Sequence, residues 1–301
     1  EVLAIQHVKH PLKRSGHSVA LHQTVDVRAD GVAQLGRSGT AGGSQNSHST
    51  DCLNRHRIRA PSTSVNLQRA GRLVREAEAG ADVAIWARNT DKNAAAVDEV
   101  RSVGVRCEAM SCDVAVPADV DAAMAATLAT FGKVDTMFAN AGVSGGAPFL
   151  DQTLDGWRAV TSVNLDGAFL TLQAAARHLV DRGEGGSLVA VASTSAIHGA
   201  PANEAYSASK AGVVSLMRGL AVEFARHGIR ANSLIPGWTE TDLTQPLLGW
   251  EKFMAATTAR TPVRRWGLPS DMGPVAVFLA DPTLTFHTGD CVVVDGGYTV
   301  F

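Results

Sequence analysis

A tyrosine and a lysine one helical turn apart are the residues of this chain with the most specific chemistry. Tyr206 and Lys210 are four positions apart, so on a helix they share one face. An ammonium group beside a phenol favours the phenolate, which predicts a pKa for Tyr206 below its ordinary value of about 10. Such a tyrosine can exchange a proton with a carbonyl oxygen, and the hydroxyl of Ser193 can hold the same oxygen. Taken alone, the pair is equally compatible with an ordinary surface contact.

The flanking sequence indicates that these residues meet at one edge of a sheet. A short apolar run over residues 187–192 ends at Ser193, as a buried parallel strand would. Apolar residues follow Tyr206 at helical spacing as far as Phe224. We therefore expect the serine at the end of a strand and the Tyr–Lys pair on the next helix. Open α/β sheets bind their ligands at this edge.

Strands and helices alternate regularly from about residue 71 onward. This alternation predicts an α/β fold with a Rossmann-like, doubly wound parallel sheet. The expected strands are 83–87, 105–112, 134–140, 187–192, 229–235 and 291–295, and the expected helices are 90–103, 117–131, 154–182, 205–227 and 270–279.

Over about residues 71–301 the chain resembles the short-chain dehydrogenase/reductase family, in particular its 3-oxoacyl-acyl carrier protein reductases and its glucose or gluconate dehydrogenases. Ser193 and Tyr206 are 13 positions apart, which is the family's spacing, and Asn164 in Val-Asn-Leu matches a further catalytic position. Four other motifs fit the family pattern: Ala139-Asn-Ala-Gly142, with the family's first Asn replaced, Cys112-Asp-Val114, Pro236-Gly-Trp-Thr-Glu-Thr241 and Asp295-Gly-Gly-Tyr298.

The resemblance implies an NAD(P)(H)-dependent oxidoreductase that interconverts a ketone and a secondary alcohol, with Asn164, Ser193, Tyr206 and Lys210 as catalytic residues. Tyr206 would be the general acid in reduction and the base in oxidation, and Ser193 would orient the carbonyl. Lys210 would lower the pKa of Tyr206 and bind the nicotinamide ribose, and Asn164 would hold a water that links Lys210 to solvent. Ser195 is 11 positions from Tyr206, which does not fit the serine's role. The implied cofactor-binding residues are Arg88, Asp113, Val114, Asn140, Ala141, Gly142, Tyr206, Lys210, Pro236, Gly237, Thr239 and Thr241.

The last residue of the strand expected at 83–87, and the residue that follows it, bear on the choice of cofactor. NAD-preferring members of the family carry an acid at this strand end, where the chain has Ala87 followed by Arg88. A guanidinium group at this place suits a 2′-phosphate. We therefore expect NADP(H) to be favoured, with NAD(H) possible. The alternative interpretation of Arg88 is a solvated surface residue.

Residues 1–69 differ in composition from the rest. Residues 1–70 hold 9 basic and 4 acidic residues, and the remainder holds 18 and 25. Counting back from Gly80 places the family's glycine-rich loop at Thr63, Leu67 and Arg69, none of which is glycine, and the preceding residues 54–61 lack the apolar character of a central strand. We expect an atypical, poorly ordered segment before an enzyme domain at 70–301, with a mis-joined start as one explanation. Alternatively, Val2–Ile5 or Val19–Leu21 supplies the missing strand.

Composition sets the remaining expectations. The 301-residue chain is 45% hydrophobic and 19% charged, with a net charge of −2, and its four cysteines show no metal-like clustering. This composition is typical of a cytoplasmic protein. The family resemblance implies a homodimer or homotetramer that acts on a small carbonyl or alcohol. The substrate stays open among a 3-oxoacyl thioester, a sugar or polyol and a cyclic ketone, with residues 145–149 and 243–254 bordering the pocket. A non-catalytic chain that only oligomerises or binds a partner is the rival hypothesis.

No nucleic-acid or membrane partner is expected from the sequence. The longest apolar runs fall short of the roughly 18 residues that a membrane-spanning helix needs. The basic N-terminal part lacks both dense basic runs and interleaved aromatic residues, so a nucleic-acid arm or a transit peptide is the less favoured interpretation. The histidines form no metal-ligand pattern, so no metal site is expected.

Overall fold

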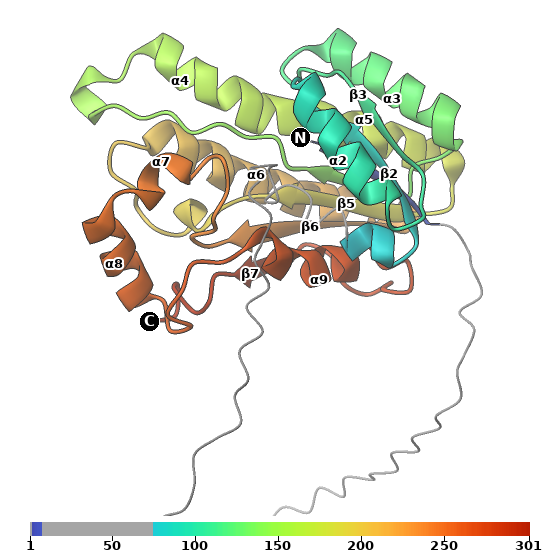
Figure 1. The fold of residues 1–301 in the computed structure, drawn as a ribbon. Helices are drawn as coiled ribbons and strands as arrows, with labels where there is room; N and C mark the ends of the chain where they lie inside the picture. The colour runs from blue at the N-terminus through green and yellow to red at the C-terminus, as the bar shows by residue number, and fades with distance from the viewer. Residues whose placement is uncertain (1, 8–74) are drawn as a thin grey trace, which may run out of the picture. The chain divides into compact units, whose positions relative to one another are not determined.

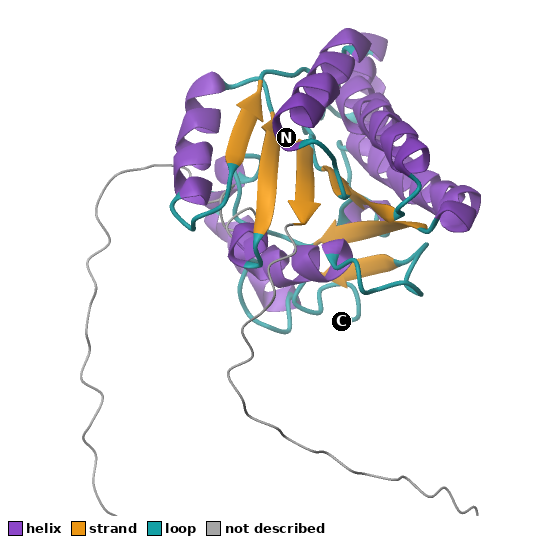
Figure 2. Ribbon diagram, turned by 90° about the vertical axis from the view of Figure 1, so that its right-hand side faces the viewer, coloured by secondary structure: helices purple, strands orange, loops and turns teal. Residues whose placement is uncertain are grey.

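The computed structural model describes residues 2–7 and 75–301, which form a seven-stranded sheet with helices on both faces (Figures 1 and 2). The strand order is β3-β2-β1-β4-β5-β6-β7. The strands are β1 Val2–His7, β2 Ala81–Trp86, β3 Cys107–Met110, β4 Thr136–Ala139, β5 Gly186–Val191, β6 Ile229–Pro236 and β7 Cys291–Val294. The helices are α2 Thr90–Arg101, α3 Pro117–Phe131, α4 Leu154–Thr161, α5 Gly167–Arg182, α6 Glu204–Phe224, α7 Gln245–Leu248, α8 Glu251–Arg260 and α9 Pro269–Ala280.

Alternate residues of the strands point to two separate apolar cores, one under each layer of helices. On one face, α3, α5 and α6 bury side chains such as Leu172 and Met217 against the sheet. On the other face, α2 and α9 bury side chains such as Val100 and Leu279. Neighbouring residues of one strand divide between the two cores, as Met137 and Phe138 do. This confirms the predicted doubly wound α/β fold.

The central strand β1 runs antiparallel to both of its neighbours, so the expectation of an all-parallel sheet is wrong at this position. Val2 pairs with Trp86 of β2 and with Ala139 of β4, and the side chain of Ala4 is 2% exposed. Either strand direction can satisfy the backbone groups of both neighbours, and an antiparallel strand needs no crossover helix to reach its place. The strand position between β2 and β4, for which residues 54–61 are unsuitable, is therefore filled by Val2–His7. This strand contains Val2–Ile5, one of the two segments considered as a replacement.

The direction of β1 decides which of its ends faces the ligand-binding edge. Because Val2 lies beside Trp86 and Ala139, the first residue of β1, and not its last, lies at the carboxyl ends of β2 and β4. His7, the last residue of β1, pairs with Ala81 at the opposite edge. The expected loop positions in 62–69, the candidate strand at 19–21 and the boundary at 69/70 lie outside the described residues.

Two segments differ from the sequence-based expectations. The helix expected over 154–182 is divided by five residues of π-helix, Ser162–Asp166, between α4 and α5. The segment between β6 and α9, for which no helix was expected, contains α7 and α8. In the part of the chain that the structure describes, no helix has the length and hydropathy to cross a bilayer. The same residues contain no group of three or more potential metal ligands.

Candidate active site

The predicted catalytic residues line one cavity at the carboxyl ends of β4, β5 and β6. The cavity has a volume of about 550 Å³. Ser193, which follows β5, lies on its wall together with Tyr206 and Lys210 from the first two turns of α6. The segment Pro236–Leu247, which follows β6, supplies much of the remaining wall. The fold therefore brings together residues that are far apart in the sequence, at the edge where a doubly wound sheet binds ligands.

Tyr206 and Lys210 share one face of α6, as their spacing predicts. Lys210 is 4% exposed, and its Nζ donates a hydrogen bond of 2.8 Å to the carbonyl oxygen of Val191 at the end of β5. The same Nζ lies 5.7 Å from the centre of the Tyr206 ring. The lysine therefore lies between the strand end and the phenol, where its charge is shielded from water.

The pKa of Tyr206 shifts in the opposite direction to the one expected. Burial raises the pKa of Tyr206 above its ordinary value, and a hydrogen bond from Ser193 only partly opposes this effect. Burial also lowers the pKa of Lys210 from 10.5 to about 8. Both shifts have the same origin, because a site with little water disfavours the charged form of each group. Tyr206 is therefore a protonated phenol near neutral pH, which is the form of a proton donor.

Ser193 is held by the backbone that follows β5. Its Oγ accepts a hydrogen bond of 3.2 Å from the backbone N–H of Ser195 and lies 3.3 Å from the Oγ of Ser195. Ser195 also lines the cavity. The two serines thus lie together, but the hydrogen bond that affects Tyr206 comes from Ser193. This agrees with the choice of Ser193 over Ser195 from the spacing.

Asn164 connects three parts of the site and does not itself line the cavity. It lies in the π-helical segment and is 1% exposed. Its side chain forms both hydrogen bonds to the backbone of Val143, at 2.8 Å to the N–H and 3.0 Å to the carbonyl oxygen. Its Nδ2 also lies 3.1 Å from the Oγ of Ser209, which donates to the carbonyl oxygen of Tyr206 at 2.7 Å. Asn164 therefore fixes the loop after β4 to the first turns of α6.

Apart from Tyr206 and Lys210, six of the predicted cofactor-binding residues line the same cavity. Close packing explains two of their glycines. A Cβ at Gly142 would lie 3.3 Å from the Nζ of Lys210, and one at Gly237 would lie 2.6 Å from the Cβ of Asp295. Asp295 in turn accepts hydrogen bonds from the backbone N–H groups of Gly297 and Thr299. The six residues are Asn140, Gly142, Pro236, Gly237, Thr239 and Thr241.

The other predicted cofactor residues lie outside this cavity. Arg88 is exposed and forms an ion pair of 3.3 Å with Asp113, beyond the ends of β2 and β3. Val114 is buried against Gly167 of α5, and Ala141 packs partly buried against the same core. The structure thus places Arg88 and Asp113 beyond the strand ends and outside the cavity that holds Lys210.

The residues present fit the nicotinamide end of a dinucleotide. Lys210 has three N–H donors and gives one to Val191, which leaves donors for the hydroxyls of a ribose. The absence of a side chain at Gly142 leaves room beside this ammonium group. The stretch Pro236–Thr241 borders the same space. These residues could therefore hold a nicotinamide riboside against Tyr206 and Ser193.

Several lining residues were not predicted from the sequence. Ser144 and Asn203 lie on the wall and are joined by a hydrogen bond of 3.3 Å. Trp238 was quoted only as part of a motif, and the structure places this residue on the wall. Of the apolar residues proposed as a lid, Leu243 and Leu247 line the cavity. Residues 145–149, which were expected to border the pocket, are not among its lining residues.

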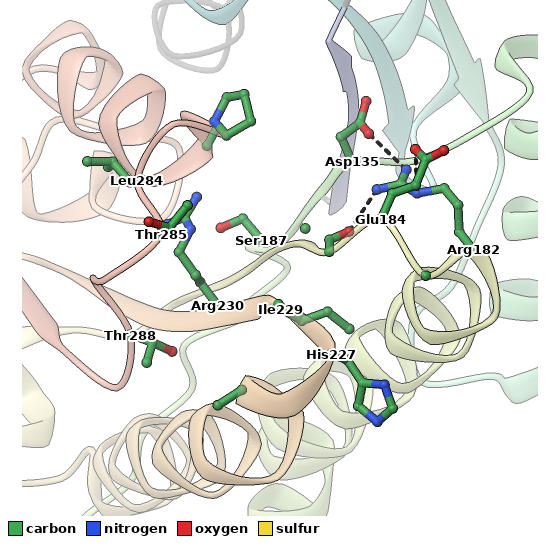
Figure 3. A pocket seen from close by; sticks show the side chains of 17 residues that line it. Asp135, Arg182, Glu184, Ser187, His227, Ile229, Arg230, Leu284, Thr285 and Thr288 are labelled. Atoms are coloured by element: carbon green, nitrogen blue, oxygen red, sulfur yellow. Dashed lines mark hydrogen bonds and ion pairs between the residues drawn. The ribbon is translucent and has the colours of Figure 1, made fainter.

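A second cavity lies at the opposite edge of the sheet, beside the first residues of β5 and β6 (Figure 3). Its volume is about 490 Å³. One wall carries the ion pair between Arg182 and Asp135 at 2.8 Å, and another carries Arg230, whose Nη2 donates to the carbonyl oxygens of Leu279 and Asp281. These contacts attach strand ends to neighbouring loops. None of the predicted catalytic or cofactor-binding residues lines this cavity, so we assign the active site to the first one.

Comparison with known proteins agrees with this geometry. Residues 74–299 match a family model described as enoyl-(acyl carrier protein) reductase. The chain is 41% identical over 225 residues to an L-rhamnose 1-dehydrogenase (NAD(P)(+)) of Sphingomonas sp. (strain SKA58). The aligned region covers 74% of this chain and 89% of that protein. It is 34% identical over 221 residues to 5-keto-D-gluconate 5-reductase of Escherichia coli (strain K12), covering 73% and 87% of the two chains.

A solved structure shows the same fold. A gluconate 5-dehydrogenase from Burkholderia cenocepacia J2315, crystallised with NADP and tartrate, is 36% identical, with a TM-score of 0.73 over 77% of this chain and 90% of that one. The relatives named here are dehydrogenases and reductases, so they give no support to the rival hypothesis of a non-catalytic chain.

Proposed function

The chain belongs to the short-chain dehydrogenase/reductase family, and from this premise we propose that Tyr206, Ser193, Lys210 and Asn164 form its catalytic centre for the interconversion of a ketone and a secondary alcohol. The observation that carries the proposal is the meeting of Ser193, Tyr206 and Lys210 on the wall of one cavity. A bound nicotinamide supplies or accepts the hydride in this chemistry.

Each residue has a role that follows from its contacts. In reduction, Tyr206 donates its phenolic proton to the carbonyl oxygen of the substrate, while Ser193 donates a hydrogen bond to the same oxygen and orients it. The raised pKa keeps Tyr206 protonated and ready to donate at neutral pH. Lys210, with a pKa near 8, is a nearby source from which the phenolate regains its proton. Asn164 is a positioning residue, because it holds the backbone on both sides of this pair.

We further propose that the cofactor is NADP(H) in preference to NAD(H). Arg88 offers a guanidinium group beyond the end of β2, where the chain has no acid to bind ribose hydroxyls. The NADP in the related gluconate 5-dehydrogenase structure and the NAD(P)(+) in the name of the rhamnose dehydrogenase support this choice.

Exposed apolar residues on three helices bear on the quaternary structure. Leu154, Phe169 and Val222 are large apolar residues that α4, α5 and α6 leave at least 45% exposed. Helices of this kind supply subunit contacts in members of the family, so we propose a homodimer or homotetramer. We propose the cytoplasm as the location.

The replacement Tyr206→Phe tests the catalytic assignment. We expect it to lower the rate of reduction by about 10²–10⁴ while leaving the fold intact, because the variant lacks only the proton-donating hydroxyl. The matched control is Tyr298→Phe, since the chain has two tyrosines and Tyr298 does not line the cavity. The assay follows NADPH consumption with sugar-derived ketones, and the fold is checked by circular dichroism. Near-normal turnover by Tyr206→Phe would show that the assignment is wrong.

A further inference from the structure

We propose that Trp238 is a stacking platform for the ring of a cyclic sugar, so that this site takes a pyranose or furanose in preference to an open-chain polyol or an acyl thioester. This inference rests on the proposed function and assigns a substrate class to the same site. It starts from the position of Trp238, which follows the Pro236-Gly237 segment and lines the cavity together with Tyr206 and Ser193.

The indole of Trp238 is part of a built aromatic cluster. One of its faces stacks on Trp266, with ring centres 5.2 Å apart and planes inclined by 24°. Phe253 of α8 meets the Trp238 ring edge-on, at 5.0 Å and 89°. Trp266 thus covers one face of the indole, and the other face is the one that we assign to the substrate.

Hydrogen bonds fix this cluster in place. The carbonyl oxygen of Trp238 accepts from the backbone N–H of Gly267 at 2.8 Å, and the N–H of Glu240 donates to the carbonyl oxygen of Gly267 at 2.9 Å. Trp266 is 3% exposed, and its indole N–H donates to the Oγ1 of Thr257 at 2.8 Å. A platform held in this way loses little conformational freedom when a ligand binds, which favours affinity.

Several other lining residues are polar. Ser144 and Asn203 form a hydrogen-bonded pair, and Ser195 lies beside the catalytic Ser193. The wall therefore combines hydroxyl and amide groups with a tryptophan. Charged side chains are few: Lys210 and Asp242 are the charged residues among those that line the cavity. Asp242 also forms an ion pair with Lys92 at 2.8 Å.

This combination matches the chemistry of a sugar ring. The axial C–H groups of such a ring form an apolar face with a slight positive charge, which is attracted by the negative face of an indole. Its hydroxyls lie around the rim, where Ser144, Asn203 and Ser195 can bond them. An extended polyol has no flat apolar face, and an acyl chain has no hydroxyls that could form hydrogen bonds with the polar part of the wall. In oxidation, a ring C–H bond would break and its hydride would pass to a bound NADP⁺. The hydroxyl proton would pass to the deprotonated Tyr206, the form that the reverse reaction leaves, and a ring carbonyl would remain.

The test compares ring and open-chain probes on three variants. Each of a panel of aldoses is paired with its alditol, and binding to the intact protein is measured by titration calorimetry while turnover is measured with NADP⁺. The panel also contains aldonates and 3-oxoacyl esters. The replacements are Trp238→Leu, Trp238→Phe, which keeps an aromatic face, and Trp250→Leu. The last is the matched control, because Trp250 stacks on Phe253 at 5.2 Å and does not line the cavity.

We expect at least one aldose to bind more tightly than its alditol, and Trp238→Leu to weaken that binding and raise its KM by about tenfold, with a smaller change in kcat. Trp238→Phe should recover most of the affinity, and Trp250→Leu should leave it unchanged. If Trp238→Leu does not fold, Trp238→Met provides the same comparison. The proposal is overturned if the protein prefers alditols, aldonates or acyl esters, or if the folded non-aromatic variant keeps its affinity for the ring.

Failure of the proposed function gives a different pattern. A chain that is not an oxidoreductase would turn over none of the probes, and Tyr206→Phe would change nothing. The calorimetric titrations still decide the present inference in that case, because they need no turnover. Aldose binding that depends on Trp238 would uphold the platform, and the absence of aldose binding would overturn it.

Discussion

Replacing Lys210 by Met should make the protein more stable at pH 7 while removing a catalytic group. Lys210 is 4% exposed, and burial lowers its pKa from 10.5 to about 8. A pKa difference of this size corresponds to about 3 kcal/mol of unfavourable free energy for keeping the buried amine charged. The hydrogen bond from Nζ to Val191, which Met cannot form, contributes about 1 kcal/mol in the other direction. We expect a net gain of about 2 kcal/mol for Lys210→Met.

The pH dependence distinguishes this cause from a simple packing effect. Below pH 8 the lysine is charged in both the folded and the unfolded state, so the folded state carries the full cost of burial. Between pH 8 and 10.5 the unfolded chain binds a proton that the folded protein does not bind, so the stability of the wild type rises with pH relative to the variant. The advantage of Lys210→Met should therefore be largest at pH 7 and shrink as the pH approaches 10.

Urea unfolding at fixed protein concentration, at pH 7, 8, 9 and 10, measures this difference. Lys252→Met is the matched control, because Lys252 is exposed on α8 and its replacement should not change the pH profile. Turnover by Lys210→Met should fall sharply in the same samples. A Lys210→Met variant that is less stable than the wild type at pH 7, or one whose stability difference is the same at every pH, would refute the reasoning.

Two further predictions concern the cofactor and the packing of the site. Joint replacement of Ala87 by Asp and of Arg88 by Ala should lower the preference for NADPH, measured as kcat/KM with NADPH divided by kcat/KM with NADH, by about tenfold or more. A wild type that works better with NADH would contradict the choice of NADP(H). Gly237→Ala should cost about 1–3 kcal/mol of unfolding free energy, because its Cβ would lie 2.6 Å from the Cβ of Asp295. Gly249→Ala, whose Cβ meets nothing within 4 Å, should be close to neutral in the same denaturation assay.

The parts of the fold that were predictable are those in which local pattern and burial agree. The expected helix at 117–131 has the observed limits of α3, since Pro117 starts it and Gly132 ends it in a left-handed conformation. The helix 154–182 was recognised, but not its π-helical segment. That irregularity depends on tertiary hydrogen bonds, which Asn164 makes to Val143 and Ser209.

The site shows the same division between local and long-range effects. The spacing of Ser193, Tyr206 and Lys210 was sufficient to predict that they meet, because a strand end and a helix face define their positions. The direction of the Tyr206 pKa shift was not predictable from this spacing, since it depends on how much water the assembled cavity excludes. The role of Trp238 was not predictable either, because its partner Trp266 is 28 residues away and is joined to it through Gly267.

The first strand provides the clearest test of a disagreement between sequence and structure. The sequence predicted a loosely attached N-terminal segment, whereas the structure buries Ala4 between Ala84 and Met137 in the centre of the sheet. Because Ala4 is buried in this strand, Ala4→Asp puts an unpaired carboxylate into an apolar core and should cost about 3 kcal/mol or more.

The control for this replacement is Ala126→Asp, at an exposed position of α3, where only a small loss of helix propensity of about 0.5 kcal/mol is expected. Thermal and urea denaturation of both variants measure the difference. A strongly destabilised Ala4→Asp beside a near-neutral Ala126→Asp would establish that residues 2–7 complete the sheet between β2 and β4. Equal stability of the two variants would mean that Ala4 is not buried, and that the centre of the sheet is closed by another part of the chain.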